Sequence, residues 1–363
     1  MQILSSLSQN PIAAHAVGET LADILEKQNE EIDVVIVGAS EHFVGTLPDI
    51  MSAISTILTP RKIGLVCTSG VIGAGFLQQA GCAIALTTFS RQENLDLFFC
   101  ADAESAAVTT ASTVVIATPL SFSQPTFSFD VFAQNHPSTN IIGGVVNSDS
   151  LDGARLGYGT KVFSGGALLL TGDFDLAATQ ALCPISDELV VTKAHGAMVM
   201  ELNHQPALSV LYDAVALSLS DSDDFFESET RRLARQQLVT SLCLITKTDG
   251  PVKILGADRT TQSIALGSAV PVGTTVQIAG ADESMTTQDL IATLSGGEVF
   301  APAALGGFML GQLTTTLMET AADTLRTSAI GGFNASPIFA QDGQGKFLSL
   351  NGSTTAIFGR HHY

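Results

Sequence analysis

Residues 330–336 read Ile330-Gly331-Gly332-Phe333-Asn334-Ala335-Ser336, and an alternating run follows at residues 347–358 after a polar, glycine-containing gap. An apolar run, a glycine pair, a small polar cluster and a second alternating run predict two strands joined by a shaped loop. The pattern recurs at residues 141–148 with 163–170, and in a looser form at residues 63–70 with 82–86. We interpret it as a repeated unit around which the chain is organised.

Each copy of the pattern follows an earlier strand and a helix. The predicted order strand, helix, strand, strand occurs within residues 33–86, 114–170 and 308–358, after a helical lead-in over residues 1–30. Several strands are apolar on both faces, which requires cover on both sides of a sheet. The sequence therefore predicts an α/β fold (α+β mixed), with two related domains of mixed β-sheets packed together and flanked by helices. A chain of 363 residues also favours two domains.

The charge balance and the hydrophobic runs limit the possible partners. The chain carries 35 Asp and Glu against 16 Lys and Arg, so 35 − 16 gives a net charge of −19. Such an acidic protein repels phosphate backbones, and nucleic acid is an improbable partner. Because the apolar runs fall well short of the roughly 18 residues that span a bilayer, we expect no membrane insertion.

The cysteines and the N-terminus predict a cytoplasmic protein. The chain has five Cys, an odd number at long spacings, which suits reduced thiols better than a disulfide framework. Residues 1–15 lack the basic start and the apolar region of a secretory signal. His, Cys, Asp and Glu do not recur at metal-ligand spacings, so we expect neither a metal nor another cofactor.

Six segments carry a family resemblance. They are the strand at residues 33–37, Cys67-Thr68-Ser69-Gly70-Val71-Ile72-Gly73, and residues 194–207, 270–276, 331–338 and 351–358. Each segment alone is weak, but their order and spacing together are specific. With them the chain resembles the FIST family, named after F-box and intracellular signal transduction proteins, over about residues 30 to 359. The Arg of the family's Cys-Asn-Gly-Arg-like stretch is absent after residues 308–314, so no role of that Arg is carried over.

The resemblance implies both a domain organisation and a role. It implies a FIST N-terminal-type domain at residues 31–192 and a FIST C-terminal-type domain at residues 193–360. It also implies an intracellular signal-transduction protein that senses a small molecule, with amino acids or related metabolites as a suggested class. Because no signalling domain is fused to this chain, a stand-alone sensor would pass its signal to a separate downstream protein. The family carries no catalytic motif.

The repeated loops supply the candidate binding residues. We expect a ligand near Cys67, Thr68, Ser69, Gly70, Gly143, Gly144, Asn147, Gly331, Gly332, Phe333 and Asn334. In this interpretation the glycine pairs let backbone amides approach a ligand, which the asparagines orient. The alternative interpretation, which is slightly favoured, is that the pairs are strand glycines permitting bulges or close packing.

Two other functions stay open on the sequence. An enzyme would use Cys67 as nucleophile, which requires a cation, a histidine or a helix N-terminus to lower the pKa of its thiol. The favoured interpretation of Cys67 is a small buried hydrophobic residue. A protein-interaction scaffold is the remaining alternative to a ligand sensor.

Overall fold

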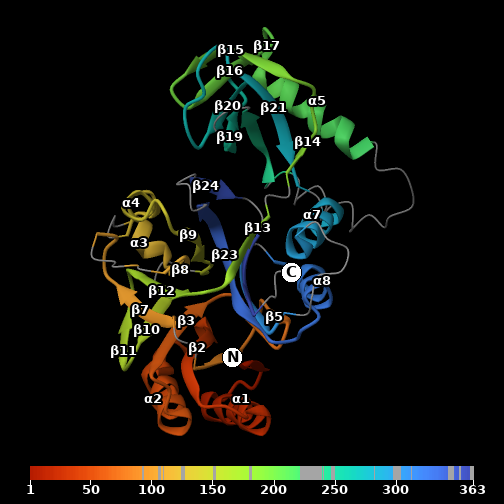
Figure 1. The fold of residues 1–363 in the computed structure, drawn as a ribbon. Helices are drawn as coiled ribbons and strands as arrows, with labels where there is room; N and C mark the ends of the chain where they lie inside the picture. The colour runs from red at the N-terminus through yellow and green to blue at the C-terminus, as the bar shows by residue number, and fades with distance from the viewer. Residues whose placement is uncertain are drawn as a thin grey trace. The chain divides into compact units, whose positions relative to one another are not determined.

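The fold was obtained as a computed structural model, shown in Figure 1, and is mixed α/β with mixed sheets flanked by helices. Compactness divides the chain into two units, one formed by Met1–Thr179 with Leu290–Tyr363 and one by Gln180–Asp289. The predicted boundary between family domains at residues 192 and 193 stays a prediction. The structure describes residues 1–91, 94–104, 108, 110–123, 127–149, 153–179, 182–220, 239, 241–246, 250–281, 283–296, 304–311, 313–341, 347–350 and 353–359.

The first β-α-β-β repeat shows the rule that the other two follow. Strand β2 (Ile32–Ser40) is buried at every position, as a strand covered on both faces must be. Helix α2 (Leu47–Leu58) begins with Pro48 in its first turn and ends at Thr59, which has φ 45°. Strand β3 (Lys62–Thr68) then pairs parallel to β2, and β6 (Ile84–Ser90) pairs antiparallel on the other edge of β2.

The second and third repeats have the same topology. In each, a helix crosses between two parallel strands, and a later strand returns antiparallel to the first. The predicted repeated unit is thereby confirmed in three copies. The second copy comprises β8 (Ser112–Ala117), α3 (Pro119–Ser123), α4 (Phe129–Asn135), β9 (Asn140–Val146) and β12 (Ala167–Gly172); the third comprises β22 (Gly306–Gly311), α8 (Thr315–Leu325), β23 (Ile330–Gln341) and β25 (Ser353–Phe358).

The repeats join into two sheets within the first unit. The six-stranded sheet has the order β1-β6-β2-β3-β10-β11. The larger sheet has the order β13-β25-β22-β23-β9-β8-β12-β7, and β23 also carries β4 and β24, with β5 beyond β4. The strands not yet bounded are β1 (Ile3–Ser8), β4 (Val71–Gly73), β5 (Phe76–Gln78), β7 (Asp96–Cys100), β10 (Arg155–Tyr158), β11 (Lys161–Phe163), β13 (Asp175–Ala178) and β24 (Phe347–Leu350).

The main core lies between these two sheets, and the helices cover their outer faces (Figure 1). Phe89 of the six-stranded sheet meets Phe358 of the larger sheet with ring centroids 5.1 Å apart. Helix α1 (Ala13–Lys27) and α2 close a second core against the six-stranded sheet. Helix α8 and the end of α7 (Glu283–Ser295) pack against β22, and α4 packs against β8 and β9.

The N-terminal lead-in contains a strand that the sequence reasoning missed. Helix α1 lies where the apolar periodicity predicted it, but β1 precedes it and pairs antiparallel with β6 along six residues. Its sequence, Ile3-Leu4-Ser5-Ser6-Leu7-Ser8, is half serine, which weakens the apolar signal of a buried strand. Its serines are bonded inside the protein: Ser5 Oγ donates to Ile330 O, and Ser6 Oγ donates to Thr20 O.

The second unit has a different, antiparallel topology. Its sheet has the order β14-β21-β15-β16-β20-β19-β18, and an additional pairing of β18 with β21 closes the strands into a ring. Helix α5 (Ala207–Ser220), predicted at residues 207–217, contributes Leu208 and Leu211 to the core of this unit. Its strands are β14 (Cys183–Pro184), β15 (Leu189–His195), β16 (Met198–Leu202), β17 (Gln205–Pro206), β18 (Cys243–Thr246), β19 (Gly250–Asp258), β20 (Ser263–Leu266) and β21 (Thr275–Gly280).

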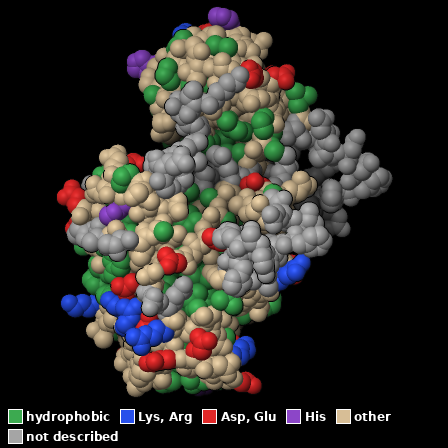
Figure 2. Space-filling model, in the orientation of Figure 1, with side chains coloured by type: hydrophobic (Ala, Val, Ile, Leu, Met, Phe, Trp, Pro, Cys, Tyr) green, Lys and Arg blue, Asp and Glu red, His purple; other side chains and the backbone are tan. Residues whose placement is uncertain are grey.

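Charged side chains are unevenly spread over the surface. On the face seen in Figure 2, Lys and Arg gather in the lower part of the first unit, while Asp and Glu are scattered. Arg61 in the first unit is itself paired, since its guanidinium donates to both carboxylate oxygens of Asp33 at 2.9 and 3.0 Å and to Asp96 at 3.1 Å. This arrangement raises the pKa of Arg61, chiefly through the hydrogen bonds to Asp33.

Candidate functional site

The sequence-predicted residues converge where β3 and β9 end and at Asn334, which lies inside β23 and not in the loop that the sequence predicted after Phe333. Ser69 N donates to Asn147 O at 3.0 Å, Asn147 N donates to Asn334 O at 2.9 Å, and Asn334 N donates to Gly70 O at 3.0 Å. We call residues 68–70, Asn147 and Asn334 the three-strand junction. Its residues come from the three repeats and are hydrogen-bonded directly to one another. Most main-chain N–H and C=O groups there therefore already have a partner.

Thr68, in the junction, and Cys67, next to it in the chain, are both buried. Thr68 Oγ1 donates to Asn147 O at 2.6 Å, which gives that carbonyl a second donor. Cys67 is fully buried, and burial raises the pKa of its thiol from 9.0 to about 12, with the charge of Glu41 adding to the effect. A thiol with this pKa is protonated at neutral pH, and the thiolate is the nucleophilic form.

The predicted glycines occupy tightly packed backbone positions. A side chain on Gly143 would come within 2.6 Å of the Phe129 ring and 2.8 Å of Val115 O. Gly332 has φ 142°, and a Cβ there would overlap the backbone of Met309. Gly331 has a similar conflict with the side chain of Thr87. At these three positions glycine permits a close approach of packed strands.

Gly144, Phe333 and Asn334 differ in what they offer. Gly144 is a paired residue of β9, and the Phe333 ring is in the core, edge-on to Phe308 with centroids 5.5 Å apart. Asn334 is 6% exposed, and its Oδ1 has no hydrogen-bond partner among the described residues. Its side chain lies against Gly70, where an added Cβ would come within 2.9 Å of Asn334 Cβ. Asn334 Oδ1 is therefore an acceptor at the junction that has hydrogen-bonding capacity to spare.

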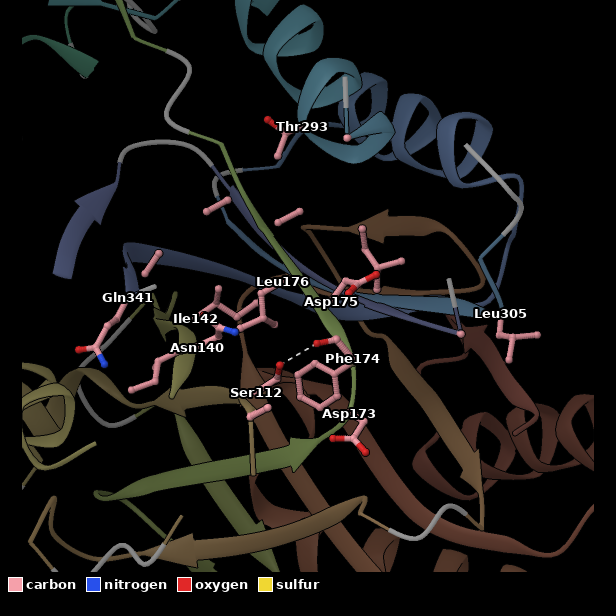
Figure 3. Close-up of a pocket in the computed structure, with 18 of the residues that line it drawn as sticks. Ser112, Asn140, Ile142, Asp173, Phe174, Asp175, Leu176, Thr293, Leu305 and Gln341 are labelled. Atoms are coloured by element: carbon pink, nitrogen blue, oxygen red, sulfur yellow. Dashed lines mark hydrogen bonds between the residues drawn. The ribbon is translucent and has the colours of Figure 1, made fainter. Parts of the chain in front are cut away.

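A cavity of about 1080 Å³ lies at the other end of β9 (Figure 3). Asn140 lines this cavity and Asn147 lies in the junction, so along an extended strand about 23 Å separate the two regions. We call it the β13 cavity, because it includes every residue of β13. Its lining residues are Met1, Ala111, Ser112, Asn140, Ile141, Ile142, Asp173, Phe174, Asp175, Leu176, Ala177, Ala178, Thr293, Gly296, Leu305, Ala340, Gln341, Ile357 and Gly359.

The β13 cavity combines an apolar wall with a few polar groups. Ile142 belongs to the main core and Leu176 packs against it, so the cavity wall between β9 and β13 is apolar. Asp173 and Asp175 contribute carboxylates, and the described lining residues include no Lys or Arg. Gln341 is oriented by its Nε2, which donates to His136 O at 2.8 Å. A concave, partly apolar site with a few polar groups is the usual form of a small-molecule site.

Sequence reasoning did not find the β13 cavity. The only local signal is Asp173-Phe174-Asp175-Leu176, in which acidic and apolar residues alternate directly after a buried strand. Four residues of alternation are too few to distinguish a strand from a turn. The cavity walls also come from β8, β9, β23, β25 and α7, which are far apart in sequence.

The described residues include neither a metal-binding cluster nor a membrane-spanning helix. In that part of the chain no three or more His, Cys, Asp and Glu side chains are grouped so as to hold a metal ion. Its helices are all too short or too polar to cross a membrane.

Comparison with known proteins finds a family domain in part of the chain. The FIST N domain matches residues 33–205. The chain is 27% identical to the uncharacterized protein Rv0628c of Mycobacterium tuberculosis, over 92% of this chain and 94% of that protein. It is 24% identical to the uncharacterized protein Mb0898c of Mycobacterium bovis, over 76% of this chain and 74% of that protein. Residues 33–205 thus match the FIST N domain, in agreement with the resemblance that the sequence predicted, and this domain indicates a sensory or signal-transduction role.

Proposed function

We propose that the protein is a non-catalytic sensor that binds a small molecule in the β13 cavity and passes the signal to a separate downstream protein in the cytoplasm. The observation that carries this proposal is the cavity itself. Its volume of about 1080 Å³ matches the upper end of ordinary ligand sites, roughly 300–1,000 Å³. The FIST N domain supports the sensory part of the proposal, and amino acids or related metabolites are the class that the family resemblance implies.

The environment of Cys67 supports the non-catalytic part. The enzyme alternative requires an accessible thiolate, whereas the Cys67 side chain is buried and burial raises the pKa of its thiol to about 12. An alkylating probe near neutral pH should leave Cys67 unmodified in the folded protein. Rapid modification of Cys67 would instead favour the enzyme alternative.

The loop residues predicted from the sequence form a second proposed contact region. This proposal rests on Asn334, whose Oδ1 lacks a partner among the described residues and accepts hydrogen bonds. Cys67, Thr68, Ser69, Gly70, Gly143, Gly144, Asn147, Gly331, Gly332 and Phe333 would support that contact by holding the three strands together.

A thermal-shift screen against amino acids and other small metabolites tests the proposal. A ligand at 100 times its Kd stabilises the folded protein by about 2.7 kcal/mol, which is a shift of several degrees in Tm. Ala178→Phe places a ring at the exposed rim of the cavity and should abolish the shift. Ala14→Phe, at an exposed position of α1, is the matched control and should retain it. Equal shifts in both variants would place the ligand elsewhere, and no shift across the library would contradict a sensing role.

A further inference from the structure

Strand β13 is an edge strand whose free side opens into the β13 cavity. It pairs antiparallel with β25 along Asp175–Ala178 and has no second partner strand among the described residues. Edge strands expose unpaired backbone groups, and proteins usually keep such edges short or cover them. This edge is four residues long and every one of them lines the cavity.

The direction of the backbone groups follows from the hydrogen bonds on either side. Thr179 N donates to Ser353 O at 2.8 Å, so Thr179 faces β25. Antiparallel residues alternate between facing the partner and facing away, so Ala177 also faces β25, whereas Leu176 and Ala178 face the free edge. Phe174, two residues earlier, confirms the alternation because its carbonyl faces away from β25 and accepts from Ser112 Oγ at 2.7 Å, as Figure 3 shows.

The backbone groups of Leu176 and Ala178 are available for pairing. Within the described residues, neither residue makes a main-chain hydrogen bond on this side. A peptide-like molecule can bond to two such residues of an edge strand, because its own N–H and C=O groups repeat with the same spacing. The four residues of β13 present about 13 Å of extended strand.

The surroundings of this edge define which side chains would suit it. Asp173 directly precedes β13 and places an exposed carboxylate at one end of the strand, and the described lining residues include no Lys or Arg. The apolar wall at Ile142 and Leu176 accepts small aliphatic groups. An alternation of cationic and aliphatic side chains therefore complements both the charge and the apolar surface.

We infer that the ligand of the β13 cavity is a short, extended, cationic peptide or a compound with the same backbone pattern, bound as an added strand on β13. This inference rests on the proposed function, since it names the ligand class of the same cavity. Main-chain hydrogen bonds to Leu176 and Ala178 supply the affinity, and the acidic end of the strand selects against anionic ligands.

The first experiment measures the binding of capped hexapeptides by isothermal titration calorimetry. The probe alternates Lys and Val, and four comparison peptides each change one property. In the first, Glu replaces Lys. The second and third carry N-methyl groups on alternate amides, one peptide for each edge of the strand, and the fourth has the same residues rearranged into blocks. We expect the Lys-Val probe to bind at least tenfold more tightly than the Glu version. N-methylation of one edge should weaken binding at least tenfold, while N-methylation of the other edge should leave it within threefold.

The second experiment removes one backbone donor from the protein. Ala178→Pro deletes the N–H that faces the cavity but leaves the β25 ladder intact, since residue 178 does not bond to β25. Ala178→Val keeps the N–H and is the matched control. We expect at least a tenfold weaker affinity for Ala178→Pro and little change for Ala178→Val, with circular dichroism verifying that both variants are folded. Asp173→Asn should lower the affinity for the Lys-Val probe alone.

The outcomes separate this inference from the proposed function. If metabolites shift the Tm of the protein and Ala178→Phe abolishes the shift, but no hexapeptide binds, the inference is overturned and the proposed function stands. Equal binding of both N-methylated peptides would also overturn the inference. So would a dimer, detected by light scattering, that Ala178→Pro dissociates, because β13 would then pair with a second copy of the chain. If neither a metabolite nor a hexapeptide binds in the cavity, both the inference and the proposed function are overturned.

Discussion

The two ends of β9 are constructed in opposite ways. At the C-terminal end, main-chain groups of Ser69, Asn147 and Asn334 bond to one another across three repeats. At the N-terminal end, the strands separate around a cavity of about 1080 Å³, and β13 turns an unpaired edge into it. The glycine and asparagine residues with the clearest sequence pattern thus hold strands together, whereas the hydrogen-bonding capacity left for a ligand lies mostly at the opposite end.

The largest expected effect comes from the close packing beside the junction. Gly332→Ala would force a Cβ into the backbone of Met309 at φ 142°, so we expect a loss of about 3 kcal/mol or more in the free energy of unfolding. Gly159→Ala is the matched control, because Gly159 has φ 61° but no atom within 4 Å of an added Cβ. It should cost only about 1 kcal/mol. Urea denaturation measures both, and equal losses would mean that the contact with Met309 is unimportant.

A pH-dependent effect, smaller than that of Gly332→Ala up to about pH 11, comes from the Cys67 thiol. Its pKa is raised to about 12 in the folded protein by burial, so above pH 9 the unfolded chain binds fewer protons than the folded protein. The stabilising contribution of Cys67 is therefore complete below about pH 9 and falls by about 1.4 kcal/mol per pH unit between pH 9 and 12.

Comparison of wild type with Cys67→Ala isolates this contribution. Cys100 and Cys243 also have raised thiol pKa values, to about 11 and about 12 through burial, but they are present in both proteins. The difference in unfolding free energy between the two proteins should be constant from pH 6 to 8 and should decrease above pH 9. A constant difference up to pH 11 would show that Cys67 is not buried as described.

Substitutions of two buried threonines allow the junction and the cavity end to be compared directly. Thr68 Oγ1 is bonded to Asn147 O in the junction, whereas Thr113 Oγ1, near the cavity end of β8, has no partner among the described residues. Thr68→Val should destabilise the protein by about 1 kcal/mol, because it removes a buried hydrogen bond. Thr113→Val should be neutral or stabilising by up to about 1 kcal/mol, because it removes an unsatisfied hydroxyl. The opposite ranking in thermal unfolding would contradict the bonding pattern.

The smallest effect on stability is expected at the rim of the cavity. Asp173 is exposed, and its Oδ2 accepts a hydrogen bond from Asn94 Nδ2 at 2.6 Å. The side-chain oxygen of an asparagine at this position can accept the same hydrogen bond. Asp173→Asn should therefore change the unfolding free energy by less than about 0.5 kcal/mol. A larger loss would assign Asp173 a structural role, and its use in binding assays would then need a different substitution.

Much of the architecture could be predicted from local patterns. Helices α1 and α2 follow from apolar periodicity and from Pro48 at the start of α2, and the three β-α-β-β repeats follow from recurrent strand and glycine patterns. These features depend on residues close together in the chain, which periodicity reports directly. The strand β1 was not predicted, because three serines interrupt its apolar pattern. Their hydrogen-bond partners, such as Ile330 O for Ser5, are brought close only in the folded protein.

For the candidate site, the sequence by itself determined the residues of the junction but not their neighbours in space. The hydrogen bonds that link Gly70 and Asn147 to Asn334 depend on the pairing of β23 with β9, which joins residues almost 200 positions apart. The cavity likewise exists only because β13 pairs with β25 near the C-terminus and leaves its other edge free. Local periodicity encodes which faces are buried, whereas the partner of each strand is chosen by packing across the whole unit, and this is why only the tertiary structure located the cavity.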